Sequence, residues 1–198
     1  FFVVDAISTI CADIFMMDEW HVDVSLLSSQ KALALPPGLS FLALNKKAKL
    51  RLETKTCQSY YFDIKAYLAN QERGQMPFTP VIGHFMMLHE RLREIRSHGI
   101  GFFVSHHSKL AEYFRKGLKD LPLSFLSNSP SNALTAISCP KDIDAFDLVT
   151  RLADDYNCFV APNGGDLKYR VFRVSHLGEQ NETDIDFLIN ALEDILNN

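Results

Sequence analysis

The sequence is poor in the residue patterns that build metal centres and disulfide frameworks. Its four cysteines are Cys11, Cys57, Cys139 and Cys158. They form no CxxC pair, so their spacing indicates neither a zinc site nor a disulfide framework. His106 and His107 are adjacent, but neighbours on a helix point about 100° apart, and no HExxH spacing occurs. We therefore expect no metal site, and reduced cysteines as in a cytoplasmic protein.

Long apolar runs and an excess of basic charge are also missing. No stretch approaches the roughly 18 apolar residues of a membrane helix, and residues 1–4 are too short for a signal-peptide core. Lys and Arg total 20 against 24 Asp and Glu, which gives a net charge of −4. We expect no basic cluster and hence no nucleic-acid partner, and the lack of a long apolar run predicts no membrane partner.

The apolar content of 47% is ample for a core in a chain of 198 residues. Short apolar runs occupy residues 1–4, 22–27 and 39–44. Their hydrophobicity is continuous rather than alternating, which predicts strands buried on both faces of an α/β sheet that helices cover. Residues 45–55 and 59–70 are mixed in character and fit either helix or loop.

A helical pattern follows, with Pro80 in its first turn and Gly99 at its C-terminal cap. The apolar stripe of this helix is predicted to contain Ile82, Phe85, Met86, Leu88, Leu92 and Ile95. Met86 and Met87 are interpreted as core residues. A second helix is predicted over residues 102–118, with Leu110, Phe114 and Leu118 on one stripe.

Beyond Pro122 the pattern predicts a small α+β layer with helices on one face of a sheet. Its expected order is strand, strand, helix, strand, strand, helix. The ranges are 123–126, 133–138, 142–157, 158–161, 169–174 and 183–196. We place a domain boundary near residues 99–101, and residues 181–184 are predicted to start the last helix.

Two residues at the ends of apolar runs suggest chemistry. Lys31 lies where the second run gives way to a turn, and Asp5 directly follows the first run. A pyridoxal phosphate enzyme needs such a pair, a lysine to hold the cofactor aldehyde as a Schiff base and an acid to keep the pyridine nitrogen protonated. Taken singly, each also fits an ordinary role, the lysine on the surface and the aspartate in a turn or cap.

Several separated motifs resemble the class V aminotransferases, most closely the serine–pyruvate and alanine–glyoxylate type. They are VVDAIS at residues 3–8, MDEWHVDV at 17–24, SSQKAL at 28–33, PPG at 36–38, PFTP at 77–80 and FRVSHLG at 172–178. The resemblance implies the C-terminal half of a fold-type-I pyridoxal phosphate enzyme. Residues 1–99 would be the remnant of the large, mainly parallel sheet domain, and residues 100–198 the small α+β domain.

The resemblance also implies roles for five residues. Lys31 would bind the cofactor and move the proton, Asp5 would pair with the pyridine nitrogen, and Gln30 would touch the cofactor. Arg173 would clamp the substrate carboxylate, and Thr79 would reach the cofactor of the neighbouring subunit in a homodimer.

Simpler interpretations of these positions stay open. Arg173 can instead pair with an acid such as Glu179, and Thr79 can be an ordinary N-cap. Ser28 and Ser29 can either bind the cofactor phosphate or hold the backbone.

The expected reaction is transamination between a small amino acid and a 2-oxo acid such as glyoxylate or pyruvate. A 2-aminoethylphosphonate-type transaminase, a lyase or desulfurase on the same fold, and a noncatalytic remnant or interaction module are the alternatives. In the family the Gly-rich phosphate-binding segment and the stacking aromatic precede the Asp5 strand. We expect a chain without them to bind the cofactor poorly.

Overall fold

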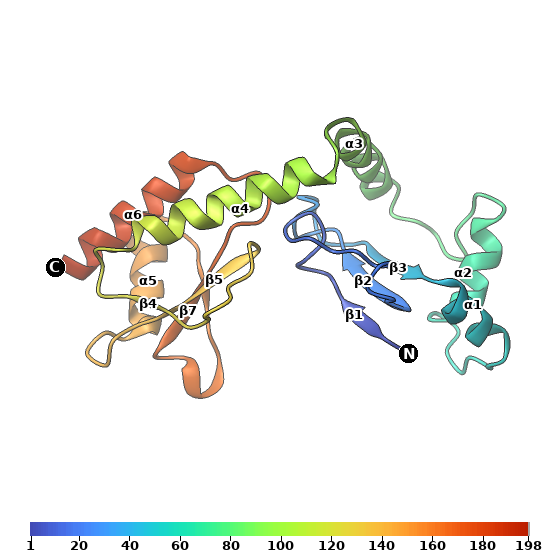
Figure 1. The fold of residues 1–198 in the computed structure, drawn as a ribbon, viewed down its shortest axis with the longest axis horizontal. Helices are drawn as coiled ribbons and strands as arrows, with labels where there is room; N and C mark the ends of the chain where they lie inside the picture. The colour runs from blue at the N-terminus through green and yellow to red at the C-terminus, as the bar shows by residue number, and fades with distance from the viewer. Residues whose placement is uncertain (198) are drawn as a thin grey trace. The chain divides into compact units, whose positions relative to one another are not determined.

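The computed structural model describes residues 1–197, and its chain divides into two compact units (Figure 1). The first contains Phe1–Ile10 and Phe15–Ser97. The second contains Cys11–Ile14 and the residues from His98 onward. None of the helices in this described part combines the length and the apolar composition that a bilayer span requires.

The first unit is built on a three-stranded sheet of order β1-β2-β3. Strand β1 (Val3–Asp5) runs parallel to β2 (Val24–Ser28), and β3 (Ser40–Leu44) is antiparallel to β2. The strands lie where the apolar runs predict them, but their burial on both faces is wrong. Leu26 and Leu42 form a cross-strand pair and are 36% and 46% exposed, so one face of this sheet is open in this chain.

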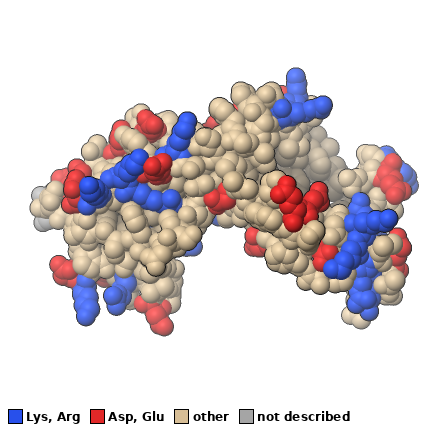
Figure 2. Space-filling view, viewed as in Figure 1, with Lys and Arg blue, Asp and Glu red and all other residues tan. Residues whose placement is uncertain are grey.

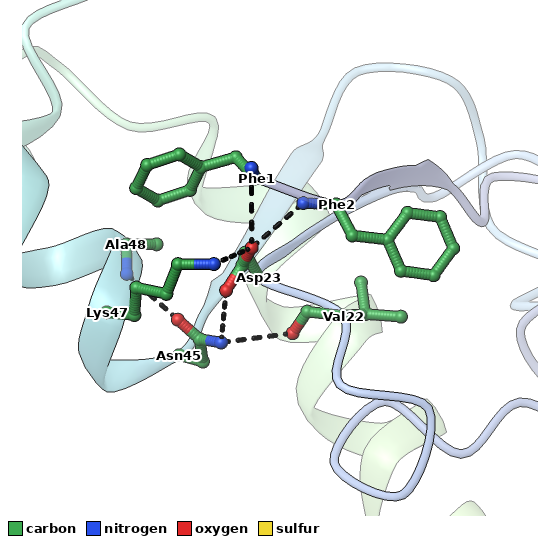
Figure 3. Close-up of polar contacts among 7 residues, drawn as sticks. All are labelled: Phe1, Phe2, Val22, Asp23, Asn45, Lys47 and Ala48. Carbon is green, nitrogen blue, oxygen red and sulfur yellow. Dashed lines mark hydrogen bonds and ion pairs between the residues drawn. The ribbon is translucent and has the colours of Figure 1, made fainter.

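Asp23 joins three segments of the first unit just before β2 (Figure 3). Its buried carboxylate accepts hydrogen bonds from the backbone N–H of Phe2 at 2.8 Å and from Lys47 Nζ at 2.9 Å. Asn45 Nδ2 donates to the same carboxylate at 2.8 Å, while Asn45 Oδ1 accepts from the N–H of Ala48 at 2.8 Å and so caps α1 (Lys46–Glu53). Lys47, followed by Phe2 and Asn45, holds the pKa of Asp23 well below its usual value.

Basic side chains gather at α1, contrary to the expectation of no basic cluster (Figure 2). The net charge averages over the chain and therefore hides this local group. The cluster consists of Lys46, Lys47, Lys49, Arg51 and Lys55. The following helix is α2 (Ile64–Gln71), which Asp63 caps by accepting from the N–H of Lys65 at 3.1 Å.

Helix α3 (Ile82–His98) differs from its prediction in both its start and its buried face. It begins two residues after Pro80. The predicted apolar stripe is largely exposed, since Ile82 is 61% and Met86 68% exposed, and Met87 is exposed as well. The interpretation of Met86 and Met87 as core residues is therefore wrong. The stripe that turns away from solvent keeps Leu88 and Ile95 of the predicted set but also contains the polar residues His84 and Arg91, whose side chains meet backbone carbonyls.

The second unit follows the predicted order of elements. Its helices are α4 (Ile100–Gly117), α5 (Ala145–Tyr156) and α6 (Glu182–Asn197), and a 3-10 turn covers Gly165–Leu167. Its strands are β4 (Ser124–Phe125), β5 (Leu134–Ser138), β6 (Ala161–Pro162) and β7 (Val171–Ser175). They form an antiparallel sheet of order β4-β5-β7-β6. Residues 158–160, which were predicted as strand, lie outside it.

The core of the second unit lies between one face of this sheet and its three helices (Figure 1). Ile137 pairs with Phe172, and Thr135 pairs with Val174, so these four side chains share that face and all are buried. Successive strand residues alternate between faces. Arg173, between Phe172 and Val174, therefore lies on the opposite, open face of β7.

Candidate active site

The carboxyl ends of β1 and β2 meet at one edge of the first sheet because the two strands are parallel. Asp5 is the last residue of β1, and Gln30 and Lys31 lie two and three residues after the end of β2. In open α/β sheets, ligands bind in the crevice outside the carboxyl ends of the strands. The pairing thus brings three of the five predicted site residues, Asp5, Gln30 and Lys31, to the edge where a cofactor would bind.

Ser29 closes the turn that carries Lys31. The Ser29 side chain is fully buried, and its N–H donates to the carbonyl of Leu39 at 3.1 Å. Its Oγ donates to the Pro36 carbonyl at 2.8 Å and accepts from the N–H of Leu39 at 3.2 Å, while its carbonyl accepts from Leu35 at 3.1 Å. Of the two roles left open for Ser29, these bonds support the one in which it holds the backbone. Lys31 consequently stands on a compact, internally bonded loop.

The Lys31 side chain is half-buried. Its amine makes no hydrogen bond or ion pair with any described residue. Gln30 is exposed, and its Oε1 accepts a hydrogen bond from Ser28 Oγ, which also approaches the Leu39 carbonyl at 3.4 Å. A half-buried amine without a counter-ion can react with an aldehyde more readily than one held in an ion pair.

Asp5 uses one carboxylate oxygen locally. Its Oδ1 accepts from the N–H of Ile7 at 3.0 Å, which is an Asx turn rather than a helix cap. The side chain is exposed, and Oδ2 has no partner within residues 1–197. The turn fixes the direction of the carboxylate, and Oδ2 can still accept a hydrogen bond from another donor.

Thr79 lies outside α3 and is exposed. The first bonds of the helix run from the N–H groups of His84 and Phe85 to the carbonyl of Val81, at 3.0 and 3.2 Å. Val81 therefore occupies the cap position, and the interpretation of Thr79 as an N-cap is wrong. The segment 77–80 leads into the helix without belonging to its first turn.

Arg173 belongs to the second unit and is exposed on the open face of β7. Its neighbours on that face are the small side chains of Ala136 and Ala161, with which it pairs across the sheet. Its Nη2 donates to the carbonyl of Pro162 at 3.1 Å, and no acid within residues 1–197, including Glu179, forms an ion pair with it. Strand alternation turns this guanidinium outward, away from the core of the second unit. The guanidinium faces solvent and forms no ion pair with a described residue.

A buried polar group that the motifs did not reveal lies on the core side of the same sheet, on the face opposite to Arg173. Thr135 Oγ1 accepts from Arg115 Nε at 2.9 Å and lies 2.8 Å from His176 Nε2. Burial, followed by electrostatic interactions with Arg115 and His107, lowers the pKa of His176 to about 4, so its ring is neutral at physiological pH. The sequence signal is His176 directly after the β7 strand.

The adjacent histidines His106 and His107 point to different backbone carbonyls. His106 Nε2 lies 3.1 Å from the carbonyl of Gln180, and His107 Nδ1 lies 2.9 Å from that of Cys11. No group of three or more potential metal ligands occurs in the part of the chain that the structure describes.

Comparison with known proteins assigns the chain to a family. The model of the family described as aminotransferase class-V matches residues 1–165. The chain belongs to the class V aminotransferases. The resemblance stated from its motifs is thereby confirmed. Membership of this family implies pyridoxal phosphate as cofactor.

Three relatives illustrate how the chain aligns. It is 33% identical over 198 residues to a serine–glyoxylate aminotransferase of Arabidopsis thaliana, covering 98% of this chain and 49% of the relative. It is 30% identical over 196 residues to a Synechococcus protein named soluble hydrogenase, small subunit, and this match covers 98% of this chain and 51% of the relative. An alanine–glyoxylate aminotransferase from Nostoc sp. superposes with a TM-score of 0.91 at 27% identity, over 98% of this chain and 53% of that chain. The predicted fold is confirmed, and the chain spans about half the length of the relatives it matches.

The residues at the carboxyl edge fit pyridoxal phosphate chemically. The cofactor needs an amine for its aldehyde, and Lys31 presents one without a counter-ion. It also needs a carboxylate for the pyridine N–H, and Asp5 has an oxygen to spare at the same edge. A matching amine and carboxylate thus lie at the end of β1 and in the loop after β2, and these two strands are adjacent and parallel.

Proposed function

We propose that the protein containing this chain is a pyridoxal phosphate-dependent transaminase. It would move an amino group between a small amino acid and a 2-oxo acid of the glyoxylate or pyruvate type. The observation that carries the proposal is the half-buried Lys31 amine on a bonded turn, at the same sheet edge as the Asp5 carboxylate. The names of the Arabidopsis and Nostoc relatives support glyoxylate as the acceptor.

Lys31 and Asp5 would have different roles in this reaction. When bound, the cofactor supplies an electron sink that weakens the bond between the α-carbon and its hydrogen. Lys31 would hold the cofactor aldehyde and, once displaced by the substrate amine, carry the proton to and from the α-carbon. A general base held in reach contributes about 10²–10⁴-fold. Asp5 would keep the pyridine nitrogen protonated, because a nearby carboxylate stabilises the charged ring.

The remaining predicted residues would bind and orient. Gln30 would contact the cofactor beside Lys31. Thr79 would reach the cofactor of the other subunit in a cytoplasmic homodimer. Arg173 would clamp the substrate carboxylate with its guanidinium fork, which matches a carboxylate in two parallel hydrogen bonds. In this proposal residues 1–99 are the C-terminal part of the cofactor-binding domain, and residues 100–198 form the small domain.

Covalent trapping of the cofactor tests the role of Lys31. The protein is incubated with pyridoxal phosphate and reduced with borohydride, and peptide mapping locates the added mass. We expect the label on Lys31 in the wild type, no label at that site in Lys31→Ala, and unchanged labelling in Lys49→Ala, an exposed lysine of α1. A Lys31→Ala protein that is labelled as fully as the wild type would show that another amine holds the cofactor.

Steady-state kinetics test the role of Arg173. The Arg173→Gln variant should raise KM for the amino acid and leave cofactor trapping intact, because this residue would meet substrate and not cofactor. Losing hydrogen bonds to a charged group costs about 1.5–3 kcal/mol, so kcat/KM should fall roughly ten- to a hundredfold. Arg170→Gln, an exposed arginine just before β7, is the matched control. Equal kcat/KM in Arg173→Gln and Arg170→Gln would place the carboxylate clamp elsewhere.

The same assays separate the alternatives. A noncatalytic remnant would not trap cofactor on Lys31. A lyase or desulfurase would trap it but would not convert a 2-oxo acid to an amino acid. A 2-aminoethylphosphonate-type enzyme would transfer the amino group only from the phosphonate donor.

A further inference from the structure

Helix α3 turns one narrow stripe away from solvent. The stripe consists of His84, Leu88, Arg91 and Ile95, and every other residue of the helix is exposed. Positions four, seven and eleven residues after the first lie within about 40° of it on a helix. Arg91 is the single buried residue of α3. The helix buries Arg91 but leaves Ile82 and Met86 exposed to solvent. The surface that its stripe packs against must therefore offer polar groups.

That surface is the loop that carries Lys31. Arg91 is 8% exposed, and its Nη2 donates to the carbonyl of Ala32, the residue after Lys31, at 3.5 Å. Its Nη1 donates to Glu94 at 2.6 Å, one turn along the same helix. Burying a guanidinium is unfavourable unless its donors find acceptors. The carbonyl of Ala32 is one of those acceptors, so the burial of Arg91 depends on the position of the loop.

The other end of the loop meets the same stripe two turns earlier. His84 Nε2 lies 3.1 Å from the carbonyl of Pro37, to which it donates as N–H. Gly38 lies against the ring, because a Cβ at this position would come within 2.7 Å of His84 Nε2. Its φ of +150° also favours glycine. The close packing of His84 on Gly38 keeps the imidazole at the Pro37 carbonyl.

We infer that Arg91 and His84 are positioning residues that set the Lys31 loop in place from α3. The inference rests on the proposed role of Lys31. The two contacts hold carbonyls on either side of residues 33–36, while Ser29 bonds the loop from within. Neither residue need touch cofactor or substrate. Their effect is to restrict the backbone from which the Lys31 amine projects, and a precise amine position is what proton transfer requires.

Hydrogen exchange of the intact protein tests this inference independently of the cofactor. Arg91→Met keeps the aliphatic stem and removes the donors. We expect exchange at the amides of residues 33–39 to become about tenfold faster, and exchange in β7 of the second unit to stay unchanged. Arg93→Met is the matched control, because Arg93 also pairs with a glutamate three residues away, Glu90, but is 69% exposed. His84→Leu is a second variant, which should loosen the Pro37 end.

Borohydride trapping then links the loop to Lys31. Arg91→Met should slow labelling of Lys31 while Arg93→Met does not, and Arg91→Lys, which keeps a charged donor, should restore part of the rate. If the wild type traps cofactor on Lys31 but Arg91→Met and His84→Leu exchange and trap like Arg93→Met, the inference is overturned. If the wild type does not trap cofactor on Lys31, the proposed function fails, and the exchange data still decide whether α3 restrains the loop.

Discussion

At the scale of single residues, Asp23 gives the first unit a dependence of stability on pH. Its pKa is held well below the usual value by the hydrogen bond from Lys47, with those from Phe2 and Asn45 adding to it. A depressed folded-state pKa means that the carboxylate stabilises the fold above its unfolded pKa of about 4, and that this stabilisation is lost as the pH falls below it. Asp23→Asn should therefore lower stability at neutral pH and flatten the dependence of stability on pH below about pH 5.

Urea unfolding at a series of pH values measures the stability of the unit that contains Asp23. The fluorescence of Trp20, the single tryptophan, which lies in the same unit, follows the unfolding. Glu19→Gln, at an exposed acid next to Trp20, is the control and should keep the wild-type pH dependence. Parallel curves for Asp23→Asn and the wild type would mean that the carboxylate is not what makes this unit sensitive to acid.

At the scale of elements, α6 depends on a reciprocal cap at its start. Asn181 Oδ1 accepts from the N–H groups of Thr183 and Asp184 at 2.8 and 3.2 Å, and Asp184 Oδ2 accepts from the N–H of Asn181 at 2.9 Å. Replacing such a cap by alanine costs about 0.5–2 kcal/mol. Asn181→Ala should destabilise the second unit by that amount, measured by hydrogen exchange in α6. Glu193→Ala, at an exposed position of the same helix, should stay within about 0.5 kcal/mol of the wild type.

The elements also show what the sequence can and cannot predict. The start of α6 at residues 181–184 was predictable because a cap is a local pattern, and so was the strand-end position of Lys31. The buried face of α3 was not. Hydrophobic periodicity identifies apolar residues but not the surface they meet, and the surface opposite α3 contains carbonyls. Arg91 and Ala32 are 59 residues apart, and His84 and Pro37 are 47 apart, so no local spacing reveals their contacts.

At the scale of the whole molecule, the two units differ in how much apolar side chain they bury. The largest fully buried apolar side chains are Phe114, Phe172, Ile137, Leu148, Leu152 and Leu192, and all belong to the second unit. In the first unit Val22 is buried, whereas Phe1, Tyr60 and Phe62 are more than half exposed. Since burial of apolar surface is the main favourable contribution to folding, the second unit has the larger share of it.

We therefore expect the chain of residues 1–198 to open unevenly. Amides of β5, β7 and α6 should exchange at least about a hundredfold more slowly than those of β1, β2 and β3, because local opening of a small core costs less free energy. Limited proteolysis should likewise cleave first within residues 1–97 and leave the second unit intact. Both measurements should be made at low protein concentration, because association between copies would protect exposed apolar side chains. Equal, strong protection of the two units in a monomer would show that the first unit closes a core of its own, contrary to its exposed aromatic residues.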